Sequence, residues 1–337
     1  MLPRILAALA LACGGIGWAA AAASLPASEA RGVGPAEAAA WLTRIQRAVG
    51  NTSFRGTFVV SEGGRMSSSR IEHYGEGDQQ FEHIESLDGP VRRVFRHNDV
   101  VHTLWPQSRV ALVEQWRAAS LFPSLLQGNG TSFAEHYTLR QDGSDRVAGR
   151  EAQVLRVDPK DGDRYGYRLW SDRATGLLLR ADVLGARGDV LESVAFSELS
   201  LGVKPNSASV LKSMRKLDGY RVLRPDFTPT QLDIEGWVVN ASVPGFRQIS
   251  CVKRTIEARG AGSPASELVQ AVWSDGLTTV SVFLEPFSAE RHAKEMQTSI
   301  GATQTVMWRK ADWWVTVMGD VPAPTLLKFA QSLERVR

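Results

Sequence analysis

The feature of this sequence that most constrains its fold is a long succession of short segments rich in β-branched and aromatic residues, which begins at Phe54. Each segment is about seven residues long and is bounded by Gly, Asp, Asn or Pro, as strands joined by tight turns are. The connections include Gly63-Gly64 and Thr175-Gly176, which favour hairpin turns. The predicted strands are 54–60, 68–74, 79–85, 91–97, 99–105, 109–115, 134–140, 151–157, 164–171, 177–184 and 190–199. So many consecutive strands predict one large antiparallel sheet that curves into an open half-barrel.

A helix is expected just before this sheet. Residues 24–35 are rich in Ala, Gly, Pro and Ser and favour a flexible lead-in. From Pro35 to Gly50 apolar side chains recur at helical spacing, which predicts an amphipathic helix. The apolar positions are Ala38, Trp41, Leu42, Ile45, Ala48 and Val49.

One apolar segment interrupts the strands, between Trp116 and Gly130. Its apolar side chains are Leu121, Phe122, Leu125 and Leu126. A long excursion of this composition is often a short helix that plugs the open side of a sheet. The alternative is a mobile cover over an apolar cavity.

A second, smaller unit is predicted after a loose connector. Residues 201–235 contain three prolines around a helix expected at 208–217, which separates a domain at 36–200 from one at 236–337. The second domain is predicted to have strands near 236–243, 248–257, 267–274, 277–284, 302–309 and 312–319, with helices near 288–297 and 324–336. The whole chain is therefore expected to be an α+β protein: a large curved antiparallel sheet with helices, followed by a compact α+β domain.

The first residues are typical of an export signal. Arg4 precedes an apolar run that ends in small residues at Ala23, so residues 1–23 are predicted to be a signal peptide cleaved near Ala22 or Ala23. The alternative is a lipid-modified Cys13. Removal of the signal leaves Cys251 as the only thiol, so no internal disulfide is expected.

No pattern in the chain indicates catalysis, a metal or a cofactor. The six histidines lack the spacing of a metal site, and no G-x-S-x-G elbow occurs. Asp158, Asp161 and Asp163 miss the spacing of a calcium loop, so a turn explains them better. Carboxylate pairs that converge from distant strands are left open. Lys and Arg number 39 against 36 Asp and Glu, too even a balance to indicate nucleic acid.

Trp313-Trp314 is the most notable aromatic pair. Adjacent residues on a strand point to opposite faces, so one of the two must leave the core side. It is either covered by another part of the chain or forms a contact surface for a partner, since Trp is favoured in interfaces.

Several segments resemble the RseB/MucB family of periplasmic regulators of the sigma-E (AlgU-type) envelope stress response. The resemblance covers nearly the whole mature chain, and its segments are individually weak turn-and-strand patterns in a specific order. They are Asp88-Gly89-Pro90-Val91-Arg92-Arg93, 161–167 with Trp170-Ser171-Asp172, 175–182 with Leu191-Glu192, Val243-Pro244-Gly245-Phe246, 273–277 with 280–282, and 317–322.

The resemblance implies an N-terminal half-barrel similar to LolA and LolB and a C-terminal domain that shares in partner binding. It implies a periplasmic negative regulator that holds the periplasmic part of a membrane-anchored RseA/MucA-like anti-sigma factor and shields it from proteolysis. It also implies a response to lipopolysaccharide-type lipids. Leu121, Phe122, Leu125 and Leu126 are the candidates for acyl chains, and Arg92, Arg93 and Arg96 for lipid phosphates.

Two other functions are alternatives to this one. A lipid or lipoprotein carrier would retain lipid and have no stable protein partner, and an envelope hydrolase would need motifs that are absent. Both halves of the chain are expected to be needed for tight binding, because linked contacts raise the effective concentration. The oligomeric state is left open, with a homo-oligomer as one option.

Overall fold

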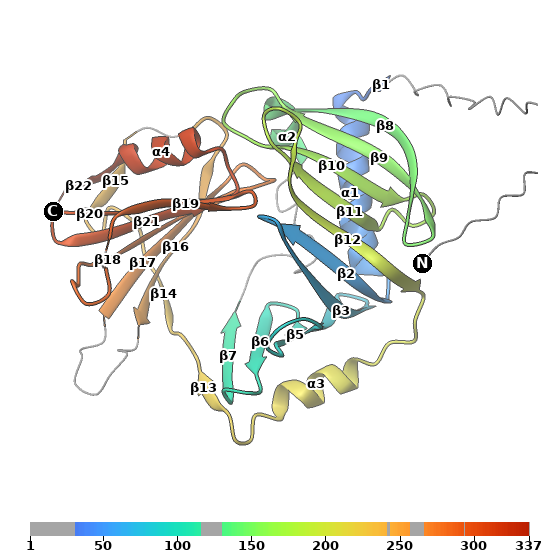
Figure 1. The fold of residues 1–337 in the computed structure, drawn as a ribbon, viewed down its shortest axis with the longest axis horizontal. Coiled ribbons are helices and arrows are strands. Elements are labelled where there is room, and N and C mark those ends of the chain that lie inside the picture. Colours follow the sequence, from blue (N-terminus) through green and yellow to red (C-terminus); the bar gives the residue numbers. More distant parts are fainter. Residues whose placement is uncertain (1–30, 116–129, 241–242, 257–265, 293, 337) are drawn as a thin grey trace, which may run out of the picture.

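The structure is a computed structural model that describes residues 31–115, 130–240, 243–256, 266–292 and 294–336 (Figure 1). The predicted signal peptide lies outside the described residues, and so do Leu121, Phe122, Leu125 and Leu126. In the part of the chain that is described, no helix is long and apolar enough to cross a membrane.

The N-terminal part is built around one curved sheet of thirteen strands, in the order β1-β8-β9-β10-β11-β12-β2-β3-β4-β5-β6-β7-β13. Its strands are β1 (Arg31–Gly32), β2 (Phe54–Glu62), β3 (Arg65–Glu76), β4 (Gln79–Ser86), β5 (Arg93–His97), β6 (Val100–Trp105), β7 (Val110–Gln115), β8 (Tyr137–Val147), β9 (Arg150–Pro159), β10 (Gly166–Asp172), β11 (Leu178–Leu184), β12 (Val190–Leu201) and β13 (Arg221–Leu223). Neighbouring strands are antiparallel except β13, which runs parallel to β7. The large curved antiparallel sheet predicted from the sequence is confirmed.

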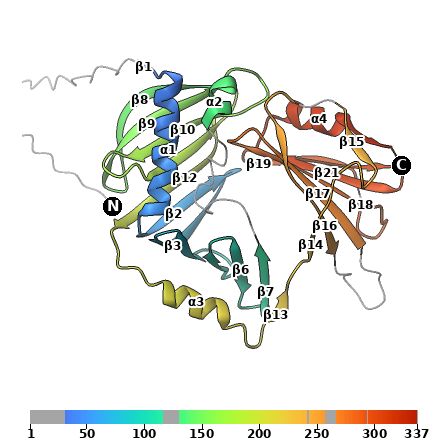
Figure 2. The same cartoon turned by 180° about the vertical axis from the view of Figure 1, so that it is seen from behind.

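Helices pack on both faces of this sheet. α1 (Pro35–Asn51) crosses one face and buries Ala38, Leu42 and Ile45 against β8–β11. Figure 2 shows α1 lying across these strands. α3 (Ser207–Arg215) packs Val210 and Met214 against Tyr74 and other residues of the opposite face. A short helix, α2 (Gly130–His136), leads into β8.

The C-terminal part has its own sheet of seven strands, in the order β14-β16-β17-β18-β21-β20-β19. Its elements are β14 (Phe227–Pro229), β16 (Arg247–Ile256), β17 (Ser266–Ser274), β18 (Thr279–Pro286), β19 (Met296–Ile300), β20 (Thr303–Lys310), β21 (Trp313–Gly319) and α4 (Ala323–Ser332), with a small pair of strands β15 (Trp237–Val239) and β22 (Leu333–Arg335). α4 packs Leu326 and Phe329 against one face of the sheet. Each part therefore has its own apolar core, and Leu277, between β17 and β18, packs in the core of the first sheet.

The predicted helix at 288–297 is wrong. Ser288 begins a single turn in which its carbonyl accepts hydrogen bonds from the amides of Arg291 and His292. The ring of His292 stacks on Trp314 at 4.8 Å, which fixes this turn against the sheet. The chain then extends into β19, because β20 offers a free edge for pairing.

Candidate functional site at the junction of the two sheets

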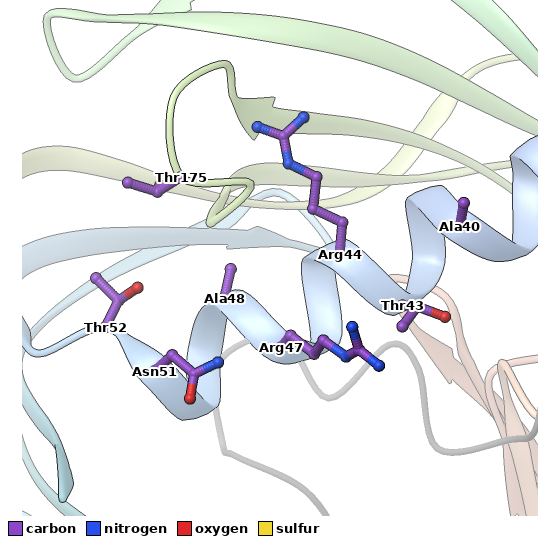
Figure 3. A pocket seen from close by; sticks show the side chains of 8 residues that line it. All are labelled: Ala40, Thr43, Arg44, Arg47, Ala48, Asn51, Thr52 and Thr175. Atoms are coloured by element: carbon purple, nitrogen blue, oxygen red, sulfur yellow. The ribbon is translucent and has the colours of Figure 1, made fainter. Parts of the chain in front are cut away.

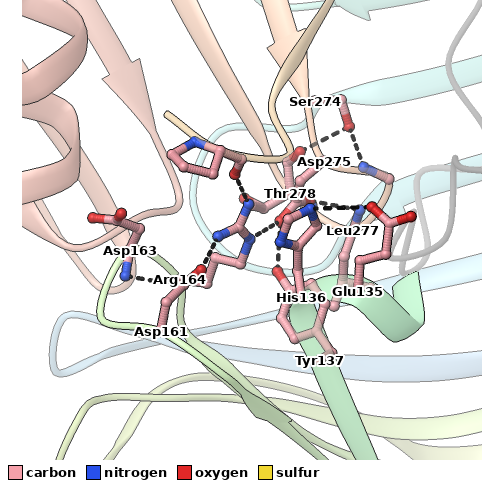
Figure 4. A network of polar contacts seen from close by, with 12 residues as sticks. Glu135, His136, Tyr137, Asp161, Asp163, Arg164, Ser274, Asp275, Leu277 and Thr278 are labelled. Carbon is pink, nitrogen blue, oxygen red and sulfur yellow. Dashed lines mark hydrogen bonds and ion pairs between the residues drawn. The ribbon is translucent and has the colours of Figure 1, made fainter. Parts of the chain in front are cut away.

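The two sheets are joined by a buried ion pair between Arg164 and Asp275 (Figure 4). Arg164 precedes β10 and Asp275 follows β17, and both side chains are fully buried. Nε of Arg164 lies 2.8 Å from Oδ2 of Asp275, and Nη1 lies 2.5 Å from Oδ2 of Asp161. Nη2 donates to the carbonyl of Pro244. We call this group the junction.

The carboxylate of Asp275 is satisfied on both oxygens. The hydroxyl of Tyr137 donates to Oδ2 at 2.7 Å, and the amides of Leu277 and Thr278 donate to Oδ1 at 2.9 Å each. Burial, followed by the charges of Tyr167 and Asp275, raises the pKa of Tyr137, so it remains a neutral donor. A buried pair stabilises a structure only when its remaining polar groups are bonded in this way. The junction therefore holds the sheets in one arrangement.

Further contacts extend the junction toward α4. Asp163 accepts hydrogen bonds from Lys328 Nζ at 2.5 Å and from the hydroxyl of Thr325 at 3.1 Å. Asp158 turns instead to the first sheet, where Arg156 and Arg140 each lie 2.8 Å away. Burial alone would raise the pKa of Asp158, but its two arginine partners hold it below the usual value. The three carboxylates therefore point to different cations.

A group of carboxyls lies at the edge of this contact. Glu192 on β12 is paired with Glu62 on β2, and the hairpin between β19 and β20 brings Gly301 against Glu62 and the carbonyl of Leu191. Burial, then the charge of Asp320 and then that of Glu62, raises the pKa of Glu192 to about 7. Glu192 therefore ionises near neutral pH, beside the contact between the sheets.

The sheets also meet at a second point, far from the junction in the sequence. Arg254 on β16 lies 3.4 Å from Glu114 on β7, and its guanidinium stacks 4.7 Å from the ring centre of Phe227. Since both partners are partly exposed, this pair contributes little energy. The contact does bring the end of the second sheet formed by β14 and β16 beside β7 of the first sheet.

The face of the second sheet opposite α4 carries two complete rows of uncharged side chains, which we call the uncharged face. The register of the strands aligns Ser250, Val272, Ser281, Met318, Thr305 and Thr298 in one row, and Val252, Gln270, Phe283, Thr316, Met307 and Met296 in the other. All twelve are at least partly exposed. Three of the chain's six methionines lie here. Methionine adapts its shape to a partner, so such a surface favours protein binding.

An open groove runs along α1, with a volume of about 610 Å³ (Figure 3). Arg44 and Arg47 line it together with Thr175. Arg44 donates to the carbonyls of Arg173 and Ala174 at 2.7 and 3.3 Å, so its charge is held against the turn before β11. The groove is open to solvent and no large apolar side chain lines it, so it is not a pocket for acyl chains.

The three arginines suggested for lipid phosphates do not lie together. Arg92 and Arg93 are exposed, and Arg93 pairs with Glu85 at 3.0 Å. Arg96 is only 6% exposed and lies 3.4 Å from the carboxylate of Glu82, which also contacts His73. Arg96 is thus committed to a buried polar cluster, whereas Arg92 and Arg93 face solvent.

The two adjacent tryptophans point to opposite faces of the second sheet, as the alternation of a strand requires. Trp313 packs on the α4 side, 5.6 Å from Trp237 and 4.8 Å from the guanidinium of Arg335. Trp314 faces the other side and is 5% exposed, because His292 stacks on it. Trp314 is therefore covered within the chain, and Trp313 is partly exposed.

Both parts of the chain match one protein family. Residues 37–214 match the MucB/RseB N-terminal domain, and residues 231–334 match the MucB/RseB C-terminal domain. The chain belongs to the MucB/RseB family. The resemblance seen in the sequence is confirmed, and members of this family are named as regulatory proteins of sigma factors.

Individual relatives of the MucB/RseB family cover almost the whole chain. The sigma factor AlgU regulatory protein MucB of Pseudomonas aeruginosa is 31% identical over 92% of this chain and 93% of its own length. The sigma-E factor regulatory protein RseB of Escherichia coli is 22% identical over 97% and 96%. A structure of the Pseudomonas aeruginosa MucA/MucB complex aligns with a TM-score of 0.66 and 29% identity, over 89% of this chain and 99% of that chain.

Arg164, Asp275 and Tyr137 were not among the residues singled out from the sequence. Two segments that carry the MucB/RseB resemblance, 161–167 and 273–277, contain Arg164 and Asp275 and meet in the fold. The available signal was that these two segments contain residues of opposite charge, Arg164 in the first and Asp275 in the second. Nothing in the spacing of two segments 111 positions apart indicates that they touch.

Proposed function

We propose that this protein is a periplasmic negative regulator that binds the periplasmic segment of a membrane-anchored anti-sigma factor and shields that segment from proteolysis. The observation that carries this proposal is the alignment of both sheets with MucB in its complex with MucA, over 89% of this chain. The division into two domains, 36–200 and 236–337 with a connector, is part of the proposal. Each sheet is expected to contribute contacts.

We place the contact on the uncharged face. It has no charge to desolvate in its two rows, and on the side of Trp314 it is bordered by charges of both signs, from Arg254, Glu285 and Arg309. An interface core depleted of charge with a polar rim is what protein binding surfaces have. Trp313, which is partly exposed on the same sheet, is a further candidate contact.

Titration of the full-length chain with the periplasmic segment of its anti-sigma factor tests this placement. Met318→Glu puts a charge in the middle of the uncharged face, at a side chain that is 36% exposed. We expect at least a tenfold loss of affinity, about 1.4 kcal/mol, because the carboxylate must be desolvated or must exclude the partner. The matched control is Met66→Glu on β3, where Met66 is 74% exposed. Equal affinities for the two variants would contradict the placement.

Shielding is tested separately by limited proteolysis. The segment should be cleaved more slowly in the presence of a saturating amount of the protein, in proportion to the fraction bound. Protection by the wild type and by Met66→Glu, and its loss with Met318→Glu, is the expected pattern. Cleavage at an unchanged rate in a saturated complex would exclude a shielding role.

We further propose that lipopolysaccharide-type lipids weaken this binding. Arg92 and Arg93 support the idea as exposed cations beside the turn between β4 and β5. A lipid can release the partner only by preferring the partner-free state, so each ligand must weaken the other by the same factor. Partner affinity measured with and without a lipid A analogue tests the release. An affinity that does not change would exclude it, and an Arg92→Gln, Arg93→Gln variant tests the assigned residues.

A further inference from the structure

A dense group of positive charges lies on α3 and the chain that follows it. Between Lys204 and Arg224 there are six cations and a single carboxylate, Asp218, although the whole chain is nearly balanced. All six cations are exposed: Lys204, Lys212, Arg215, Lys216, Arg221 and Arg224. We call this group the basic rim. Figures 1 and 2 both show α3 and β13 at the outer border of the molecule, away from α4.

The fold of α3 aims these charges outward. Val210 and Met214 face the first sheet and are buried. Lys212, Arg215 and Lys216 follow one another at helical spacing on the opposite side, so they form one exposed stripe. The local sequence thus separates an apolar face, which anchors the helix, from a cationic face that packs on nothing in the described chain.

The helix dipole explains only part of this charge. Lys212, Arg215 and Lys216 lie at the C-terminal end of α3, where cations stabilise a helix, but Lys204 and Arg221 lie away from that end. None of the six side chains forms an ion pair with a carboxylate of the described residues. A set of unpaired cations kept on one border is the pattern of an electrostatic binding surface.

We infer that the basic rim binds the anionic surface of a phospholipid bilayer. The six charges are spread over a helix, a turn and a strand that form an outer border, and an extended anionic plane can reach all of them together. Leu211, Leu217 and Tyr220 lie between the cations and are partly exposed. Short apolar and aromatic side chains among cations are typical of segments that rest at the level of lipid head groups.

This inference rests on the periplasmic location in the proposed function. A partner anchored in the inner membrane has its periplasmic segment close to the membrane surface. A regulator held on that surface searches a thin layer rather than the whole compartment, which raises its effective concentration at the partner. The basic rim and the uncharged face lie on different parts of the molecule, so both can be occupied together.

Co-sedimentation of the full-length chain with vesicles tests the inference. Vesicles of phosphatidylcholine with about 30% phosphatidylglycerol are compared with pure phosphatidylcholine, at about 0.1 M salt. The variant is Lys212→Gln, Arg215→Gln, Lys216→Gln, and the control with the same net charge is Arg65→Gln, Arg146→Gln, Arg187→Gln, at exposed positions elsewhere. Each cation contributes about fivefold near an anionic surface, so the variant should partition about a hundredfold more weakly than the control.

The outcomes separate this inference from the proposed function. Binding to the anionic vesicles that is weakened by the basic-rim variant alone, with unchanged affinity for the soluble anti-sigma segment, is the expected result. Equal sedimentation of the variant and the control, or equal binding to both kinds of vesicle, would overturn it and leave the proposed function intact. Unchanged vesicle binding with a loss of affinity for the segment would also overturn it, because the basic rim would then serve an acidic protein.

Discussion

At the scale of single residues, the buried pair of Arg164 and Asp275 should be the most sensitive point of the fold. Asp275→Asn removes the negative charge and leaves the guanidinium of Arg164 buried beside a neutral amide. Loss of one member of a buried pair costs about 3–5 kcal/mol. Urea unfolding should therefore shift to lower concentration, whereas Asp312→Asn, at a side chain that is 99% exposed, should not change it. Equal midpoints for the two variants would show that the pair does not hold the sheets together.

Glu192 should make the stability of the fold depend on pH. Its pKa is about 7 in the folded chain against an ordinary value of 4.5, so the folded state binds the extra proton between these values. The contribution of Glu192 to the free energy of unfolding is therefore largest below pH 4.5. It falls as the pH rises through about 7 and does not change further above that pH. The test is thermal unfolding of the wild type and of Glu192→Gln between pH 5 and pH 8. The upper limit lies about one pH unit above the pKa of Glu192. A wild-type slope that persists in Glu192→Gln would assign it to another group.

The sequence predicted the positions of single residues only in part. It placed Trp313 and Trp314 on opposite faces of one strand, because alternation is a local property. It grouped Arg96 with Arg92 and Arg93 by proximity in the chain, although the burial of Arg96 depends on Glu82 of a neighbouring strand. The partners of a charged side chain are set by strand register, which a single sequence does not display.

At the scale of elements, strands and turns were predictable, whereas the helix predicted at 288–297 is not formed. Gly, Asn and Asp at the turns mark where a meander reverses, so the strands of the first sheet were found in order. The error at 288–297 arose because pairing with β20 and the stack of His292 on Trp314 override local helical preference. The short strands β1, β13, β14 and β22 were also missed, since two or three residues carry no periodic signal.

The packing of α1 against β3 gives a prediction at this scale. A Cβ on Gly75 would lie 2.3 Å from the carbonyl oxygen of Gly50 at the end of the helix. Backbone cannot move aside as a side chain can, so Gly75→Ala should displace the helix end at a cost of about 1–3 kcal/mol. Gly162→Ala, where no atom lies within 4 Å of the added carbon, is the control. Hydrogen exchange of the α1 amides should accelerate in Gly75→Ala only. Protection that stays equal in both would mean that the contact is looser than described.

At the scale of the whole molecule, the junction fixes the two sheets to each other, and the contact of Arg254 with Glu114 is a second, weaker point at which they meet. The sequence predicted two units, because the prolines and weak periodicity of the connector separate two regular patterns. It did not predict how they meet, since the junction joins residues from Tyr137 to Asp275. The junction therefore sets how the second sheet, with its uncharged face, is oriented relative to the first sheet.

The most direct test of the proposed function is photo-cross-linking in the periplasm of intact cells. A photoreactive side chain replaces Thr305 on the uncharged face, next to Met318 in the same row, and the control position is Met66 on β3. The proposed function predicts a cross-link from position 305 to the periplasmic segment of the anti-sigma factor, and none from position 66. Cross-links from position 305 to lipoproteins or lipid alone, with no anti-sigma product, would contradict it and favour a carrier.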